Sequence, residues 1–243
     1  MNLGGELVCI GGIASCFGSF FNCLIYRLPR GISLLKASHC PRCKRPLKKN
    51  AQLIPILSYF RLHRRCYWCF RPIPLHYLGV ESLTVLIWVG VYYQYGLSIE
   101  GVSYLVFFSA ILVLSALDLA YYWVPDSILC SLFLLGVGSA ILRAMFVEAM
   151  IGLIGATVLF WGISVVSQAV YKRPVIGDGD IKLLGVIGLF FGLEKAILCL
   201  YFSFILGGIL AFFLLLLKYK KRTDRLPFVP VMGLSMGSVL CLL

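Results

Sequence analysis

Two aspartates stand at the ends of long apolar segments, where a carboxylate calls for a chemical reason. Asp118 follows the apolar stretch 101–117, and Asp180 precedes the stretch 181–191. Charged side chains are costly in or beside a membrane span and therefore mark functional sites. Two carboxylates that share a site cannot both ionise easily, so one holds a proton while the other acts as a base on water. If Asp118 and Asp180 meet, they predict hydrolytic chemistry, and the glycines around Asp178 would let a backbone approach closely.

The same residues allow two other interpretations. Each aspartate would serve equally well as a helix cap or as the partner of a nearby base such as Lys182, and intramembrane acids also serve proton-coupled transport. For Asp126, which begins an apolar run, we prefer the capping interpretation. Asp178 has the character of a flexible-loop residue. Position alone therefore leaves the shared site of Asp118 and Asp180 open.

Four of the ten cysteines are organised as two C-x-x-C pairs that 22 residues separate, namely Cys40, Cys43, Cys66 and Cys69. Two thiolates three residues apart can take adjacent corners of a tetrahedron, so the two pairs together predict a closed structural zinc site. Neighbouring Lys and Arg side chains favour the thiolate form. The alternatives are a redox pair or two disulfides, which a reducing compartment disfavours. A loop with few apolar residues needs such a metal to fold.

The elements that must position these residues are membrane spans. The chain has 243 residues, of which 60% are hydrophobic and 13% charged, and this composition excludes a water-soluble globular domain. Apolar runs of about 17 to 25 residues, each long enough to cross ~30 Å of hydrocarbon, recur along the chain. We expect an all-α, polytopic integral membrane protein with about eight transmembrane helices, near residues 4–26, 77–95, 101–117, 125–142, 149–170, 181–191, 196–217 and 226–243.

The positive charges predict the orientation of these spans. The chain carries 22 Lys and Arg against 10 Asp and Glu, and the segments 27–76, 171–182 and 218–225 hold twelve, three and five of the basic residues. Eight spans put all three segments on one side, which the positive-inside rule identifies as cytoplasmic. Asp118 and Asp180 then lie at the cytoplasmic face. The loop 27–76 has no acidic residue, and we expect it to lie on anionic membrane lipids and to bind no nucleic acid.

The motifs of this chain resemble those of the type IV prepilin peptidase family along nearly its whole length. The matching motifs are Gly18-Ser19-Phe20-Phe21-Asn22, Tyr26-Arg27-Leu28-Pro29, Ser38-His39-Cys40-Pro41-x-Cys43, Ile54-Pro55-x-Leu57-Ser58-Tyr59, Tyr77 with Val80-Glu81, Asp118 with Pro125-Asp126, and Gly177-x-Gly179-Asp180-x-Lys182. The resemblance implies a membrane aspartic protease that cleaves the leader from prepilins or pseudopilins at the cytoplasmic face of the bacterial inner membrane. It also implies methylation of the new N-terminus, with S-adenosylmethionine as methyl donor.

The resemblance assigns roles to particular residues. Asp118 and Asp180 would be catalytic, with Gly177, Gly179 and Lys182 in support. It divides the chain into a first transmembrane helix, a cytoplasmic zinc-binding loop with the methyltransferase region, and a transmembrane protease core, at residues 1–26, 27–76 and 77–243. The late P-F-G-P element of the family is Pro227-Phe228-Val229-Pro230 in this chain, with valine in place of glycine.

Two other classes of protein are alternatives: a proton-coupled transporter that uses the same acids, and a membrane-anchored zinc module that binds a partner or nucleic acid. For the glycine pairs in the spans, such as Gly185 with Gly188, close helix packing is the expected role. A prepilin leader is typically basic in the family, so we expect the apolar segment of the substrate to supply most of the binding. That segment would lie between spans, beside Gly185 and Gly188.

Overall fold

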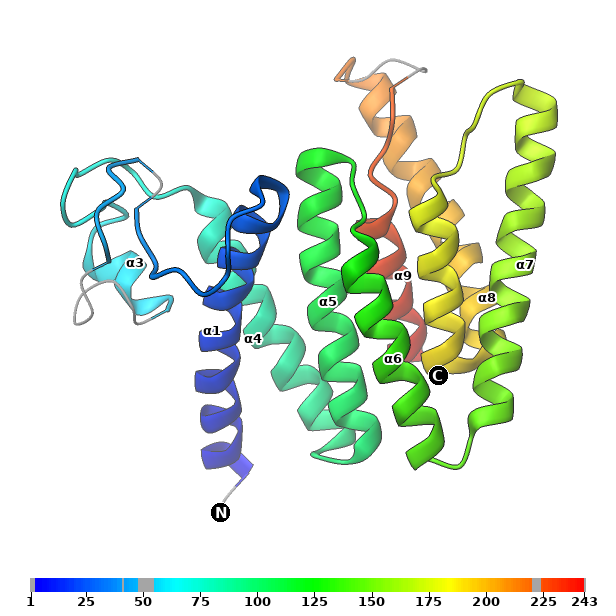
Figure 1. The fold of residues 1–243 in the computed structure, drawn as a ribbon, viewed down its shortest axis with the longest axis horizontal. Helices are drawn as coiled ribbons and strands as arrows, with labels where there is room; N and C mark the ends of the chain where they lie inside the picture. Colours follow the sequence, from blue (N-terminus) through cyan, green and yellow to red (C-terminus); the bar gives the residue numbers. More distant parts are fainter. Residues whose placement is uncertain (1–2, 41, 48–54, 220–223, 243) are drawn as a thin grey trace. The chain divides into compact units, whose positions relative to one another are not determined.

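The computed structural model describes residues 3–40, 42–47, 55–219 and 224–242. Throughout these residues the regular structure is helical, apart from two isolated β-bridges that pair His39 with Pro46 and Arg65 with Pro72. The expected all-α class is confirmed. The chain divides into two units, Met1–Gly101 and Val102–Leu243, and each has its own packed helices (Figure 1).

The first unit is a pair of long helices joined by a compact loop. Its helices are α1 (Leu3–Arg27), η1 (Leu28–Arg30), α3 (Leu57–Arg61) and α4 (Leu75–Tyr95). α1 and α4 pack side by side and come close at Gly18, where an added Cβ would lie 2.8 Å from the Cα of Glu81. Beside Gly18 in the sequence, Phe17 of α1 packs against Trp88 of α4, with ring centroids 4.9 Å apart. Gly18 is therefore required by the contact between the two helices.

The second unit is a bundle whose helices alternate in direction. They are α5 (Ile99–Tyr121), which begins just before the boundary, α6 (Asp126–Leu142), α7 (Phe146–Tyr171), α8 (Asp178–Leu216) and α9 (Val229–Leu242). α8 packs against α6, α7 and α9. Aromatic rings join α5 to α8, because Phe107 lies 5.1 Å from Phe190 and 4.9 Å from Phe191 between centroids. These contacts hold the helices that carry the two aspartates.

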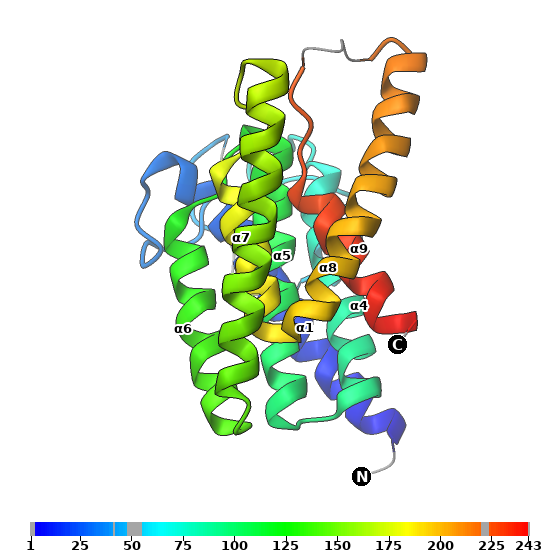
Figure 2. The ribbon, with the colours of Figure 1, turned by 90° about the vertical axis from the view of Figure 1, so that its right-hand side faces the viewer.

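α8 contains a reversal of the chain at Gly192, whose φ of 84° and ψ of 168° are not helical. Glycine adopts such a positive φ without the steric cost that a side chain would add. Figures 1 and 2 show the first arm of α8 (yellow) and the second arm (orange) running in opposite directions. The spans predicted at 181–191 and 196–217 are these two arms. The first arm, residues 178–191, is about 21 Å long at ~1.5 Å per residue.

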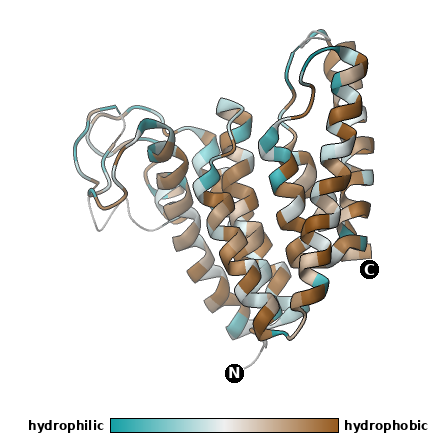
Figure 3. Cartoon of the chain, turned by 45° about the vertical axis from the view of Figure 1, so that its right-hand side comes forward, coloured by the Kyte–Doolittle hydropathy of each residue, from teal (hydrophilic) through white to brown (hydrophobic). Residues whose placement is uncertain are grey.

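Five helices in the described part of the chain, α1, α4, α5, α7 and α8, are long and apolar enough to cross a membrane. α6 and α9 are shorter apolar helices of 17 and 14 residues. In Figure 3 hydrophobic residues cover the helices, while hydrophilic residues gather mainly in the loops. The chain is a multi-pass membrane protein, and the number of eight crossings stays a prediction.

The glycines of α7 and α8 form the contact between these two helices. A Cβ on Gly188 would overlap the carbonyl oxygen of Gly152, and a Cβ on Gly152 would overlap that of Gly188. A Cβ on Gly185 would overlap the hydroxyl of Thr157. The expected packing role is confirmed. The expectation that a substrate segment lies beside Gly185 and Gly188 is wrong, because α7 fills that space.

Candidate functional site

Asp118 lies in the last turn of α5 and is buried, with 7% of its surface exposed. Its carboxylate oxygen Oδ2 accepts a hydrogen bond of 3.1 Å from the backbone N–H of Val229. Val229 is the first residue of α9 and is itself fully buried. α5 therefore carries a carboxylate whose position is fixed from a second helix.

Asp180 lies in the first turn of α8, where Gly177 is the N-cap residue. The backbone N–H of Asp180 donates to the carbonyl oxygen of Gly177 at 3.1 Å, which begins the helix. The Asp180 side chain is half-buried. A Cβ on Gly177 would lie 3.2 Å from its Oδ2, so glycine leaves room beside this carboxylate.

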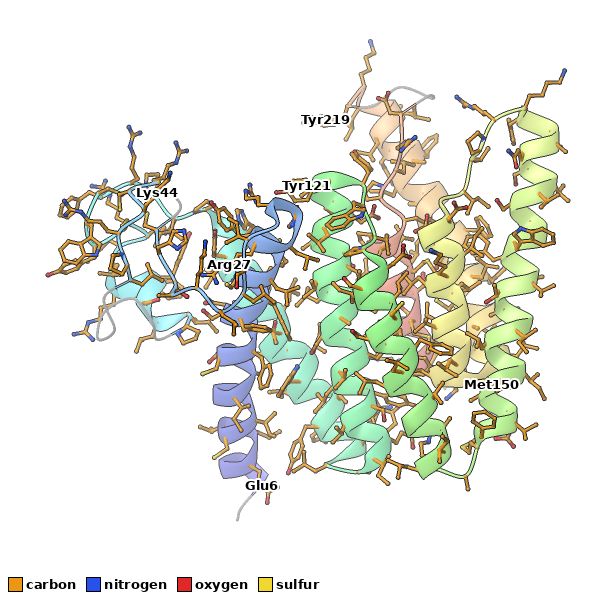
Figure 4. All side chains as sticks on the ribbon, in the orientation of Figure 1. Glu6, Arg27, Lys44, Tyr121, Met150 and Tyr219 are labelled. Carbon is orange, nitrogen blue, oxygen red and sulfur yellow. The ribbon has the colours of Figure 1, made fainter. Side chains whose placement is uncertain are left out.

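The fold brings the two aspartates together in the second unit. Gly179, the residue before Asp180, lies against Val124 in the segment that follows α5, and Asp118 is near enough for its charge to act on Asp180. They lie toward one end of the bundle: Figure 4 labels Tyr121, three residues after Asp118, at the same end as Tyr219, with Met150 toward the opposite end. Two neighbouring carboxyl groups in a partly dry site share a proton more readily than both ionise.

The other residues predicted at this site support the backbone. A Cβ on Gly179 would lie 2.8 Å from the Cβ of Val124, so this glycine lets α8 begin against the segment that joins α5 to α6. Lys182 forms a 2.6 Å ion pair with Asp126 at the exposed start of α6. The sequence also allowed Asp118 or Asp180 to pair with Lys182. In the structure the partner of Lys182 is Asp126. Asp178, the first residue of α8, is exposed.

Asp126 does not cap its helix, so the preferred interpretation from the sequence is wrong. α6 begins at Asp126, and Pro125 occupies the N-cap position with no side-chain hydrogen bond to the helix. A residue inside the first turn no longer has the extended backbone that lets a cap side chain reach the free N–H groups. The carboxylate of Asp126 instead lies beside Lys182.

Each cysteine pair forms a knuckle with the same backbone pattern. In the first, the N–H of Cys40 donates to the carbonyl of Arg45 at 3.0 Å, and the N–H of Lys44 returns to the carbonyl of Cys40 at 2.9 Å. In the second, Cys66 pairs in the same way with Arg71 at 2.9 Å and with Phe70 at 3.0 Å. Lys44 and Phe70, at matching positions, both have positive φ, 57° and 53°. The sequence repeat therefore produces a structural repeat.

The four cysteine sulfurs converge on one point. The Sγ atoms of Cys40, Cys43, Cys66 and Cys69 all lie within 4.8 Å of one another, and those of Cys40 and Cys69 are 3.9 Å apart. A tetrahedral Zn²⁺ with Zn–S bonds of ~2.3 Å places its sulfurs about 3.8 Å apart. None of the described cysteines forms a disulfide. The donor set and its geometry fit a structural zinc ion.

The knuckles also favour the thiolate form that metal binding needs. Burial raises the pKa of the Cys66 thiol, but hydrogen bonds from the backbone N–H groups of Cys69 and Trp68 and from the Cys40 and Cys69 side chains outweigh it. The pKa of Cys66 is lowered to about 7. The indole N–H of Trp68 donates to the carbonyl of Pro46 at 3.0 Å and ties the second knuckle to the first.

Two side chains anchor the loop to the helices of the first unit, a role that the sequence did not predict for them. Arg27 is buried, and its guanidinium donates to four carbonyl oxygens, those of Ser33, Leu34, Lys36 and Ala37. Glu81 on α4 accepts the backbone N–H of Ile56 at 2.7 Å. Both residues lie in motifs that match the family. Pro41 and Ile54, which belong to the same motifs, lie outside the described residues.

Models of known families match both parts of the chain. Residues 13–95 match the Bacterial Peptidase A24 N-terminal domain, and residues 105–212 match the Type IV leader peptidase family. The first match covers the cysteine loop and its two helices, and the second covers both aspartates. No solved structure matches the chain.

Several curated relatives align with most of the chain, and all those described here carry the name prepilin leader peptidase/N-methyltransferase. The protein of Bacillus subtilis is 30% identical over 227 residues, which are 93% of this chain and 89% of the relative. The protein of Klebsiella pneumoniae is 31% identical over 78% of this chain and 86% of the relative. The protein of Legionella pneumophila is 28% identical over 93% and 88%. With two family domains in order and relatives that align over most of their own length, the chain belongs to the type IV leader peptidase family.

Proposed function

We propose that this chain is an aspartic endopeptidase that removes the leader from prepilins or pseudopilins, with Asp118 and Asp180 as its catalytic pair. The observation that carries the proposal is the placement of these two carboxyl groups at one end of the second unit, one at the end of α5 and one at the start of α8, which lies against the segment that follows α5. The name of the relatives supports the substrate class.

In this mechanism the pair acts on one water molecule and one peptide bond. The ionised carboxylate takes a proton from the water as it adds to the scissile carbonyl carbon, and the protonated partner donates to the carbonyl oxygen. Collapse of the tetrahedral intermediate breaks the C–N bond, and a carboxyl group returns the proton to the departing amine. The burial of Asp118 strengthens these interactions, because nearby water would otherwise screen them.

We further propose that the site faces the cytoplasm from the bacterial inner membrane. The segments 171–182 and 218–225 carry eight basic residues; the first includes the start of α8, where Asp180 lies, and the second follows the end of α8 in the sequence. The positive-inside rule assigns such segments to the cytoplasm. The basic loop 27–76 would lie on anionic lipids, which are its proposed partners.

We propose that Cys40, Cys43, Cys66 and Cys69 hold one structural zinc ion. The ion would supply no catalysis, because four thiolates fill its coordination sphere. It would link the two knuckles and give the loop a fixed fold. On this proposal the chain consists of a first helix, residues 1–26, a zinc-binding loop, 27–76, and the protease core, 77–243.

The second half of the relatives' name extends to this chain as a proposal of N-methylation, with S-adenosylmethionine as methyl donor and the loop 27–76 as its region. The residues there do not fit that donor well. S-adenosylmethionine carries a sulfonium cation, whereas the loop has twelve basic residues and no acidic one. We therefore assign no residue to the donor and derive no step of methyl transfer.

The test is a cleavage assay on purified full-length protein with one prepilin and S-adenosylmethionine, read by mass spectrometry. Leader loss and methylation give separate mass changes. Asp118→Asn and Asp180→Asn, which keep side-chain shape but cannot exchange the proton, should each abolish cleavage, while Asp126→Asn serves as the matched control. A correctly inserted Asn variant at either position that cleaves at the wild-type rate would refute the proposal, and pH-driven uptake without cleavage would favour a transporter.

A further inference from the structure

We propose that the backbone N–H of Val229 is a positioning group of the catalytic pair, which holds the Asp118 carboxylate in place and favours its ionised form. This inference rests on the proposed function, because it gives α9 a role in the reaction of that pair. The contact that suggests it is the 3.1 Å hydrogen bond from this N–H to Oδ2 of Asp118.

The position of Val229 in its helix makes this N–H available. The first helical hydrogen bond at this end runs from the N–H of Met232 to the carbonyl of Phe228, at 3.0 Å. The N–H of Val229 therefore belongs to the first turn, where no carbonyl of the same helix can accept it. It points away from the start of α9 and donates its hydrogen bond to the carboxylate of Asp118.

The chemistry of this contact favours a negative charge on Asp118. A hydrogen bond to an ionised carboxylate is stronger than one to a neutral group. The start of a helix also carries a partial positive charge, which α9 directs at the same oxygen. Asp118 is 7% exposed and Val229 is fully buried, so little water is present to weaken the effect.

Two other helices bring charged side chains to this end of the bundle. From α8, Asp180 faces Asp118 and repels its charge. From α6, Asp126 is paired with Lys182. The described residues of α9 include no Asp, Glu, Lys, Arg or His. α9 therefore acts on the charge of the pair through its backbone N–H at Val229 and not through a charged side chain of its described residues.

The side chain of this residue has a second effect. Val229 is packed out of contact with solvent, and Pro230 follows it in the first turn of α9. Proline fixes φ near the helical value and suits the first turn of a helix. A buried β-branched residue followed by proline holds the peptide group rigidly, so the N–H stays directed at Asp118 through the reaction.

The experiment removes the N–H and keeps the helix. Val229→Pro deletes this donor at a position where proline is well tolerated, because the N–H has no partner within the helix. Val229→Ala is the matched variant that keeps the N–H and shortens the side chain. A third variant, with the α-hydroxy acid analogue of valine at position 229, replaces the amide by an ester and keeps the side chain, should proline prevent folding.

The measurement is the pH dependence of prepilin cleavage by the full-length protein. The acid limb of kcat/KM should move upward by about one pH unit in the proline and ester variants, because the ionised pair has lost a hydrogen bond. It should stay at its wild-type position in Val229→Ala, even if altered packing lowers the rate.

Two results would overturn the inference. If Asp118→Asn or Asp180→Asn remains active, the catalytic pair is wrong and the role of Val229 fails with it. If both Asn variants are inactive but the acid limb of the proline and ester variants coincides with that of the wild type, the proposed function stands and only the role of Val229 is refuted.

Discussion

The contact between α7 and α8 makes a sharp prediction for Gly152→Ala. An added Cβ on Gly152 would overlap the carbonyl oxygen of Gly188, lie 2.8 Å from its carbonyl carbon and 3.1 Å from the Cα of Gly192. These neighbours are backbone atoms, which cannot rotate away. Since ordinary contacts of a Cβ begin near 3.4 Å, the two helices must separate by at least 3.4 − 2.8, or about 0.6 Å.

A control in the same helix isolates the energy of this contact. Gly162 also lies in α7, but a Cβ there would meet no atom within 4 Å. Gly→Ala within a helix gains up to about 1 kcal/mol from propensity alone, and this gain is common to both variants. Overpacking typically costs about 1–3 kcal/mol. We therefore expect Gly152→Ala to be less stable than Gly162→Ala by about 1–3 kcal/mol.

The same displacement should reduce cleavage, because α8 also carries Asp180. A shift of ~1 Å in a catalytic group can cost about 100-fold in rate, so a loss of roughly tenfold or more is expected for Gly152→Ala. Unfolding of both variants would be followed in mixed micelles, and prepilin cleavage would be measured in parallel. Equal stability of Gly152→Ala and Gly162→Ala would refute the conclusion that Gly152 is required for the contact between α7 and α8.

The remaining predictions concern the metal and the ion pair. Cys66→Ser should lose the single zinc ion expected per chain and leave the loop open to proteolysis, as metal analysis and limited digestion would show; full zinc content in this variant would contradict the site. The pKa of Cys66 is lowered from the ordinary value of 9.0 to about 7. Its thiolate therefore stabilises the fold fully above about pH 9, and the effect is lost as the pH falls through about 7. Because protons compete with zinc for the thiolates, zinc should be retained at pH 7 and released on acidification well below the metal-free pKa, and a site that keeps its zinc at pH ~3 would exclude thiolate ligands of this kind. Asp126→Asn breaks only an exposed ion pair with Lys182 and should keep cleavage within about fivefold of the wild type; a loss as complete as that of Asp118→Asn would place Asp126 in the reaction.

Much of the fold was predictable because apolar runs of helical length leave few alternatives in a membrane. The stretches 77–95 and 125–142 agree with α4 and α6 to within two residues at each end. The structure differs where a single backbone angle decides the path. The spans predicted at 181–191 and 196–217 are the two arms of α8. They are joined at Gly192, because the reversal occupies one residue and needs no polar loop.

The parts of the candidate site that consist of side chains were predictable from the sequence. The contacts that backbone groups make were less so. The four thiols and the two acids are recognisable by type and spacing. The contact of Val229 with Asp118 is made by a backbone N–H, which every residue except proline possesses, so the type of residue at position 229 does not predict it. Asp126 shows the opposite error: its side chain suits a cap, but Pro125 takes that position.

Helix parity explains why residues so distant in sequence meet at one end of the second unit. α5 ends at that end, α6 and α7 cross the bundle once each, and α8 therefore begins there with Asp180 (Figure 1). The third group at this end is the backbone N–H of Val229, and its position depends on the reversal inside α8. Only because the chain reverses at Gly192 does the second arm of α8 return to the same end, so that α9 can begin beside Asp118. A straight α8 would place the start of α9 at the opposite end and leave Asp118 without this N–H. The short first arm of α8 and the reversal that ends it are thus the segment on which the position of α9 depends.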